Sequence, residues 1–103
     1  MKIVINDVLR NFLKKYKTAY AINNGACEEF MQTVLKRFPK AEEKVTENYT
    51  DEYGCIKING IEFSLLGHFW IYYEGKHYDA ETPSGVKDWK KLLIFNKTIK
   101  KGK

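Results

Sequence analysis

Apolar residues recur every three or four positions in two stretches near the start of the chain. The first is NDVLRNFLKKYKTAY at residues 6–20, where Asn6 is suited to cap the start of a helix. The second is ACEEFMQTVLKRF at residues 26–38, and Pro39 marks its end. The sequence AINNGA at residues 21–26 separates them with turn-forming residues. The pattern predicts two amphipathic helices, with apolar faces made by Val8, Leu9, Phe12, Leu13 and Tyr16 and by Cys27, Phe30, Met31, Val34, Leu35 and Phe38.

From residue 55 the pattern changes to alternation with a period of two. In CIKINGIEFS, residues 55–64, the dipeptide Asn59-Gly60 lies between two alternating segments, which is a strong hairpin signal because both turn residues must take positive φ. A two-residue turn there fixes the cross-strand neighbours. The predicted pairs are Ile58 with Ile61, Ile56 with Phe63, and Lys57 with Glu62 on the opposite face.

The rest of the chain predicts a second hairpin and a further strand. Residues 65–81, rich in aromatic side chains, form two strands around the turn EGK, whereas the polar residues 40–51 predict a mobile connection or lid. Residues 87–91 suit one helical turn, and LLIFNKTI at residues 92–99 suits a last strand. We therefore expect one α+β domain over residues 1–103, with two N-terminal helices packed on an antiparallel sheet of about five strands.

Composition narrows the class of protein. The chain has 103 residues and a formal net charge of +5, with much of the excess near its end, where we expect residues 100–103 to be a solvated tail. Nucleic-acid binding is possible but not favoured. Neither a secretory signal nor a membrane span is predicted, and Cys27 and Cys55 are expected to be reduced thiols of a cytoplasmic, monomeric protein.

Cys27 is a candidate nucleophile. It falls within the first turn of the second predicted helix, where unpaired N–H groups and the helix dipole favour the thiolate, which is the nucleophilic form. The other interpretation is a small apolar side chain in the core, and the neighbouring Glu28 and Glu29 oppose a thiolate.

His68 and Asp79 are the polar residues that the second hairpin brings together. A two-residue turn at Glu74-Gly75 or at the next position, or a four-residue turn, places His68 and Asp79 on one face, whereas a three-residue turn reverses this parity. A carboxylate that holds one nitrogen of an imidazole leaves the other nitrogen to face a nucleophile. These residues predict a base and its orienting acid, and a structural histidine on an aromatic sheet face is the alternative.

The order of these residues resembles that of papain-like thiol enzymes. GHFWIYYEGKHYDA, residues 67–80, resembles the histidine strand pair of NlpC-type cell-wall peptidases, and its His-x-Trp sequence is similar to that of transglutaminase-like enzymes. The resemblance implies a minimal papain-like core with Cys27 as nucleophile, His68 as general base and Asp79 as orienting residue. GACEEF lacks the Asp-Cys-Ser of the peptidases and the aromatic residue that follows the cysteine in transglutaminases, so the substrate class stays open.

The expected function is a hydrolase or acyltransferase acting on an amide, isopeptide or ester bond of a peptide or protein-like substrate, without a cofactor. Asn23 and Tyr20 are candidates for oxyanion binding beside the Cys27 N–H, and Trp70 and Tyr72 are candidates for the cleft wall. The alternative function is a small basic module that binds protein or nucleic acid. A zinc site from Cys27, Cys55, His68 and His77 is disfavoured because no pair has short ligand spacing.

Overall fold

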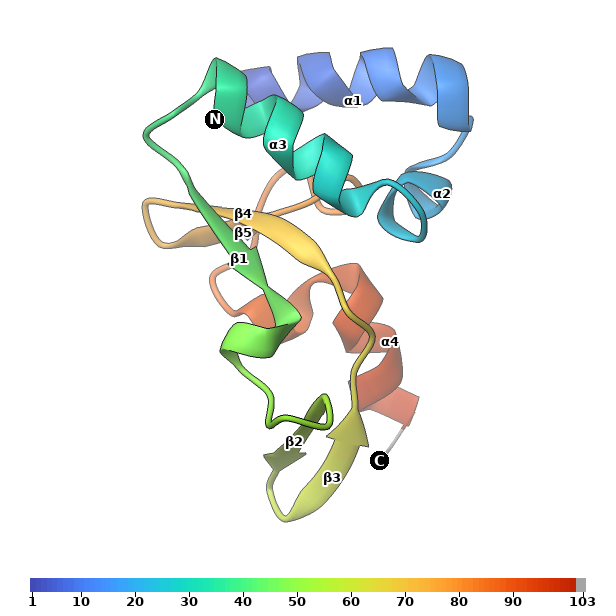
Figure 1. Ribbon diagram of the computed structural model, residues 1–103, viewed down its shortest axis with the longest axis vertical. Helices are drawn as coiled ribbons and strands as arrows, with labels where there is room; N and C mark the ends of the chain where they lie inside the picture. Colours follow the sequence, from blue (N-terminus) through green and yellow to red (C-terminus); the bar gives the residue numbers. More distant parts are fainter. Residues whose placement is uncertain (102–103) are drawn as a thin grey trace.

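The computed structural model describes residues 1–101, with side chains to residue 99, and has the α+β architecture that the sequence predicts (Figure 1). The predicted tail at residues 100–103 lies outside the part of the chain whose side chains are described. The helices are α1 (Lys2–Tyr16), α2 (Ala19–Asn23), α3 (Cys27–Arg37) and α4 (Leu93–Lys101), with 3-10 turns η1 (Thr46–Asn48) and η2 (Trp89–Lys91). The strands are β1 (Glu42–Val45), β2 (Cys55–Ile58), β3 (Ile61–Ser64), β4 (Phe69–Tyr73) and β5 (Lys76–Tyr78).

The five strands form two antiparallel sheets and not the single sheet expected. One sheet has the order β1-β4-β5, and the β2-β3 hairpin stands apart at the far end of the molecule (Figure 1). The hairpin has the predicted register, with Ile58 opposite Ile61 and Lys57 opposite Glu62. The β4-β5 turn uses Glu74 and Gly75, both with positive φ, so the parity needed to bring His68 and Asp79 together is present.

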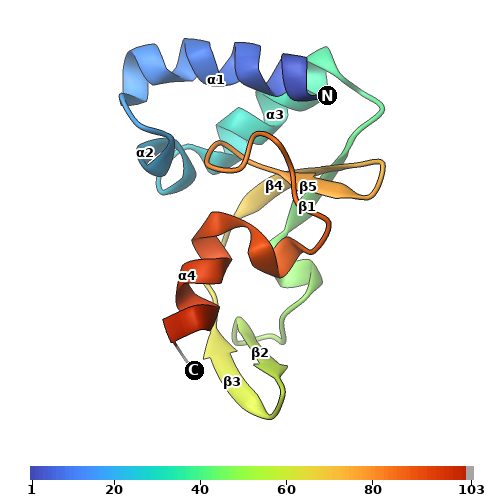
Figure 2. The same cartoon turned by 180° about the vertical axis from the view of Figure 1, so that it is seen from behind.

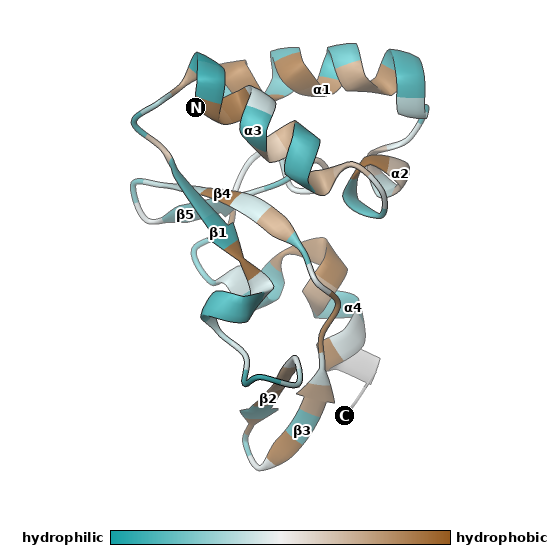
Figure 3. Cartoon of the chain, in the orientation of Figure 1, coloured by the Kyte–Doolittle hydropathy of each residue, from teal (hydrophilic) through white to brown (hydrophobic). Residues whose placement is uncertain are grey.

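The three-stranded sheet is covered on both faces, and alternate residues of β4 enter different cores. Ile71 packs with α1 and α3, whereas Trp70 packs with Trp89 and Phe95 beside η2 and α4. Figure 2 shows α4 on the side away from α1 and α3. The polar residues of α1 and α3 alternate with apolar ones along each helix, as the hydropathy colouring shows (Figure 3). This arrangement leaves the N-terminal end of α3 close to the start of β4.

Two predicted segments have different structures. Residues 42–45 form edge strand β1, not a mobile connection, because pairing with β4 uses backbone groups and tolerates polar, exposed side chains at an edge. Residues 93–101 form a helix, not a strand. Leu92 and Phe95 are buried and Ile99 packs on the same cluster, a spacing of three and four residues that fits a helix better than alternation.

The predicted helical turn at residues 87–91 is confirmed as η2, which Asp88 caps by accepting a hydrogen bond from Lys90 N at 3.0 Å. The first predicted helix ends earlier than expected, at Tyr16, and the short helix α2, whose start is capped by Thr18, overlaps the predicted break at residues 21–23. Among residues 1–101, no helix combines the length and the apolar character that crossing a membrane requires.

Gly85 offers a test of how the loop after β5 is held. Its φ is +83°, and an added Cβ would lie 2.6 Å from Cε1 of Tyr78, the residue before Asp79. We expect Gly85→Ala to lower the free energy of unfolding by about 2–5 kcal/mol, the sum of left-handed strain and overpacking. Denaturant unfolding measures this loss.

Gly75→Ala is the matched control, because Gly75 has φ +80° and an added Cβ there would meet nothing within 4 Å. It should lose only the backbone part, about 1–2 kcal/mol. Equal losses in the two variants would show that Tyr78 does not hold the loop through Gly85.

Candidate active site

Cys27 begins α3 and lies in the wall of an open cleft of about 520 Å³. The thiol is free and half-buried, and the residue before it, Ala26, provides no side-chain cap. N–H groups in the first turn of a helix have no intrahelical acceptor, so the Cys27 N–H is directed away from α3. The cleft is lined by Asn23, Asn24, Gly25, Ala26, Cys27, Glu28, Glu29, Leu66, Gly67, Phe69 and Ile94. The prediction that Cys27 lies at the start of a helix is therefore confirmed, and this residue lines a cleft.

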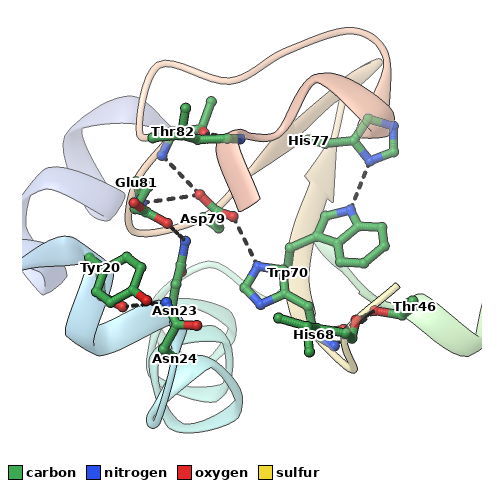
Figure 4. Close-up of polar contacts among 12 residues, drawn as sticks. Tyr20, Asn23, Asn24, Thr46, His68, Trp70, His77, Asp79, Glu81 and Thr82 are labelled. Atoms are coloured by element: carbon green, nitrogen blue, oxygen red, sulfur yellow. Dashed lines mark hydrogen bonds and ion pairs between the residues drawn. The ribbon is translucent and has the colours of Figure 1, made fainter. Parts of the chain in front are cut away.

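His68 and Asp79 form a buried pair beside this cysteine. His68 is 0% exposed, Asp79 is 1% exposed, and His68 Nε2 lies 2.9 Å from Asp79 Oδ2 (Figure 4). Because Glu74 and Gly75 make a two-residue turn, extension of the β4-β5 register places Asp79 opposite Trp70 and diagonal to His68. The structure thus brings together the base and the acid that the sequence predicts.

The second carboxylate oxygen of Asp79 is held by its own loop. Asp79 Oδ1 accepts hydrogen bonds from Thr82 N at 2.8 Å and Glu81 N at 3.1 Å. Glu81 in turn accepts a 2.9 Å bond from Asn23 Nδ2, which ties α2 to the loop (Figure 4). The loop closes on itself through paired backbone bonds between His77 and Val86. Asp79 Oδ2 is therefore fixed toward the imidazole.

Thr46 positions the backbone of His68, a role that the sequence analysis missed. Its buried hydroxyl accepts a 2.8 Å bond from His68 N and lies 2.9 Å from Leu66 O as a donor, and Thr46 N donates to His68 O at 3.0 Å. Threonine hydroxyls often form hydrogen bonds with backbone groups, so a threonine in a polar stretch does not by itself indicate this role. The imidazole ring is enclosed by Trp70 and Phe95, with centroid distances of 5.9 and 5.8 Å.

The remaining ring nitrogen, Nδ1, is not bonded to Asp79. Within the described part of the chain, His68 Nδ1 is buried and has no partner in hydrogen-bonding geometry. Cys27 and His68 nevertheless interact closely enough for each to shift the other's pKa, and Asp79 already occupies Nε2. Nδ1 is therefore the ring nitrogen that is left to interact with the thiol, although no hydrogen bond joins the two atoms in this structure. Hydrogen bonds between catalytic groups are commonly long in unliganded sites and shorten when substrate binds.

The pKa shifts favour a thiolate and an imidazolium. Burial raises the pKa of Cys27, but the neighbouring imidazole of His68 and the nearby backbone N–H groups of Phe69 and Glu28 lower it by more, so the net shift is downward. Burial lowers the pKa of His68, yet the hydrogen bond and charge of Asp79 and the proximity of Cys27 raise it to about 9. His68 is therefore protonated at neutral pH, and the thiolate of Cys27 persists to a lower pH than that of an ordinary cysteine.

The two oxyanion candidates occupy different surroundings. Asn23 is 4% exposed and lines the cleft with Cys27; it donates one amide hydrogen to Glu81 and keeps a second. Tyr20 is 60% exposed, is not among the cleft residues, and its ring lies under Lys97 Nζ at 5.5 Å. Asn23 is retained as a candidate, and Tyr20 is not.

The two predicted cleft-wall aromatics lie elsewhere. Trp70 is fully buried and donates from Nε1 to His77 Nδ1 at 2.9 Å, and Tyr72 lies against His77 and Lys44. The even-numbered face of β4 enters the α4 core, so the prediction that Trp70 and Tyr72 line the cleft was wrong. The large apolar side chains that line the cleft instead are Leu66, Phe69 and Ile94, which the sequence analysis did not single out.

Cys55 and His77 lie outside the site. Cys55 begins β2, and its sulfur contacts only Tyr53 O at 3.8 Å among the contacts described. Burial and the charge of Lys44 lower the pKa of His77, consistent with a neutral ring that accepts from Trp70. Among residues 1–101, no cluster of three or more histidine, cysteine or acidic side chains is arranged to hold a metal ion.

Asp79→Asn tests the link between the acid and the thiol. The new amide can still accept from the loop with its oxygen, but its NH₂ group then faces His68 Nε2 and forces the ring proton onto Nδ1. That tautomer cannot take the thiol proton, so we expect the pKa of Cys27 to rise toward its ordinary value. Ultraviolet absorbance of the thiolate during a pH titration of the Cys55→Ser background measures the change.

Asp88→Asn in the same background is the control, since Asp88 caps η2 and has no contact with Cys27 among the interactions described. It should leave the Cys27 titration unchanged. A Cys27 titration that is the same with Asp79 and with Asn at position 79 would rule out the coupling.

Comparison of the chain with known proteins gives no match among protein families, curated proteins or solved structures. The functional argument therefore depends on the geometry of Cys27, His68 and Asp79 and on the chemistry of the cleft beside them.

Proposed function

We propose that this chain is a thiol-dependent hydrolase or acyltransferase that acts on an amide, isopeptide or ester bond. The observation that carries the proposal is the state of His68: Nε2 is held by Asp79 at 2.9 Å, while Nδ1 is buried and has no partner within the described residues, and Cys27 lies close enough to raise the pKa of the ring. A buried polar atom without a partner carries a free-energy penalty of about 1–3 kcal/mol, which a structural histidine would have no reason to retain. Proton exchange with the thiol explains it.

The cycle follows from the positions of the three groups. Cys27 Sγ attacks the acyl carbon as a thiolate, and the carbonyl oxygen gains negative charge. The donors in this proposal to that oxyanion are the Cys27 N–H at the start of α3 and the Asn23 amide, since both residues line the cleft. His68 then donates its Nδ1 proton to the leaving amine or alcohol as the C–N or C–O bond breaks, which yields a thioester on Cys27.

The second half of the cycle regenerates the thiolate. Water, or an amine in the case of acyl transfer, gives a proton to His68 as it attacks the thioester carbon. Collapse of the adduct breaks the C–S bond and releases the acid or the new amide. Asp79 keeps the ring oriented and stabilises the imidazolium in both halves, through the bond to Nε2.

The order of the three residues supports a papain-like arrangement. A cysteine opens a helix, a histidine directly precedes a strand, and an acid directly follows the next strand, as in the NlpC-type and transglutaminase-like enzymes that the sequence resembles. In this proposal, α3 with β4 and β5 forms the minimal papain-like core.

Thiol alkylation separates this proposal from a binding module without turnover. Cys27 has a lowered pKa and lines the cleft, whereas Cys55 lies at the start of β2 away from His68, so Cys27 should react with iodoacetamide faster near pH 7. Each unit by which the pKa lies lower enlarges the thiolate fraction about tenfold at this pH. Mass spectrometry of the Cys27→Ser and Cys55→Ser variants assigns the two rates.

The pH dependence adds a second criterion. His68 is protonated below about pH 9, and the thiolate of Cys27 persists below its usual pKa, so the ion pair exists between the lowered thiol pKa and about pH 9. Hydrolysis of a thioester or activated ester should therefore fall as pH rises through about 9, where His68 loses the proton it gives to the leaving group. Equal, slow alkylation of both cysteines, with ester hydrolysis unaffected by Cys27→Ser, would favour the basic binding module instead.

A further inference from the structure

A second hollow adjoins the cleft that contains Cys27. Its volume is about 440 Å³, and it shares Gly67, the residue before His68, with the first cleft of about 520 Å³. The second hollow is lined by Thr46, Glu47, Thr50, Asp51, Glu52, Gly54, Leu65 and Gly67. We call the two together the Gly67 groove. It runs from the start of α3, past the entry to β4, toward the β2-β3 hairpin.

The charges that line the Gly67 groove are all of one sign. Its walls carry Glu28, Glu29, Glu47, Asp51 and Glu52, and no lysine or arginine is among the lining residues. The chain as a whole has 18 lysines and arginines against 13 acidic residues, so its average surface is basic. The groove therefore has a local potential opposite to the net charge of the protein, and a cleft of one sign concentrates ligands of the other.

These acids are not used to hold the fold through ion pairs. Within the described side chains, none of the five forms a salt bridge, since the pairs involve Asp7, Glu42, Asp79 and Asp88. Asp51 has a local role, accepting from Tyr53 N and Cys55 N, and Glu29 accepts from Tyr16 OH. For Glu28, Glu47 and Glu52 no side-chain partner is described, so they remain able to bind a cation.

The groove also contains the thiol of the proposed function. Cys27 lines the first hollow, and His68, whose buried Nδ1 has no partner among the described residues, lies close enough to shift the pKa of this thiol. Leu66, 64% exposed, lines the first hollow next to the shared Gly67. A reactive thiol, an exposed aliphatic side chain and acidic walls suit a peptide with aliphatic and cationic groups.

We propose that the Gly67 groove selects peptide substrates that carry lysine or arginine side chains next to the acyl group attacked by Cys27. This inference rests on the proposed function and adds the substrate class to it. Glu28 and Glu29 line the hollow that contains Cys27, and Glu47 and Glu52 line the hollow that shares Gly67 with it, so one cation would lie near each pair of glutamates.

Charged methanethiosulfonates test the first hollow without requiring turnover. The probes are the aminoethyl (cationic), sulfonatoethyl (anionic) and methyl (neutral) reagents, applied to Cys27 in a Cys55→Ser background. We expect the cationic-to-anionic rate ratio at Cys27 to exceed that of free cysteine on the order of tenfold at low salt. The excess should disappear near 1 M salt, where the screening length is about 3 Å. Glu28→Gln with Glu29→Gln should lower the ratio.

Peptide protection tests the second hollow. An acetylated trilysine amide should slow labelling of Cys27 by the neutral reagent, and an acetylated triglutamate amide should not. Glu47→Gln with Glu52→Gln should weaken this protection several-fold. Glu43→Gln is the control, because Glu43 is equally exposed but lies on β1 outside the groove.

The outcomes distinguish this inference from the proposed function. Fast labelling of Cys27 by the neutral reagent, with no preference for cations and no protection by trilysine, would overturn the substrate class and leave the thiol chemistry standing. Slow labelling of Cys27 by the neutral reagent, no faster than Cys55 in the Cys27→Ser variant, would instead overturn the thiol chemistry. Protection that is the same in the Glu47→Gln/Glu52→Gln and Glu43→Gln variants would remove the second hollow from the site.

Discussion

The buried pair between His68 and Asp79 constrains the rest of this structure. Removing two charged groups from water carries a desolvation penalty of several kcal/mol per ion, which is offset only where the geometry is good and the remaining lone pairs are satisfied. Asp79 meets this condition through two backbone N–H groups of its own loop, and the backbone of His68 is satisfied by Thr46. The β4-β5 hairpin, the loop after it and the turn after β1 are thus all required to keep one imidazole in place.

The same hairpin separates the cleft that contains Cys27 from the interior. Alternate residues of β4 enter the α1-α3 core and the α4 core, so both faces of the strand are buried at Trp70 and Ile71. Only at its start, around Gly67 and Phe69, does the chain reach the cleft. The imidazole lies at this boundary, enclosed by Trp70 and Phe95 on one side and facing the half-buried Cys27 on the other. Burial there shields the ion pair from solvent while the sulfur stays accessible.

Local rules predicted the features that depend on neighbouring residues. Positive φ at Asn59-Gly60 and at Glu74-Gly75 fixed both hairpin registers, and register then determined that His68 and Asp79 share a face. The predictions that were wrong mostly concern features that depend on residues far away in the sequence. Strand β1 exists because β4 offers it backbone pairs, and its polar side chains carry no alternation. Trp70 is buried because α4 covers that face of the sheet. The sequence pattern predicted a strand in place of α4, although Leu92, Phe95 and Ile99 have helical spacing.

The acidic side chains of the Gly67 groove favour a cationic ligand but oppose ionisation of the Cys27 thiol. Glu28 and Glu29 follow Cys27 directly, and a negative potential opposes ionisation of a thiol. Both carboxylates are exposed, so solvent and salt screen them, whereas the His68 charge acts at short range from a buried position where screening is weak. The imidazolium lowers the pKa of Cys27, and burial of the thiol, not the charge of the glutamates, is what raises it. The thiolate therefore depends on His68, and through it on Asp79, more than on the N-terminal end of α3.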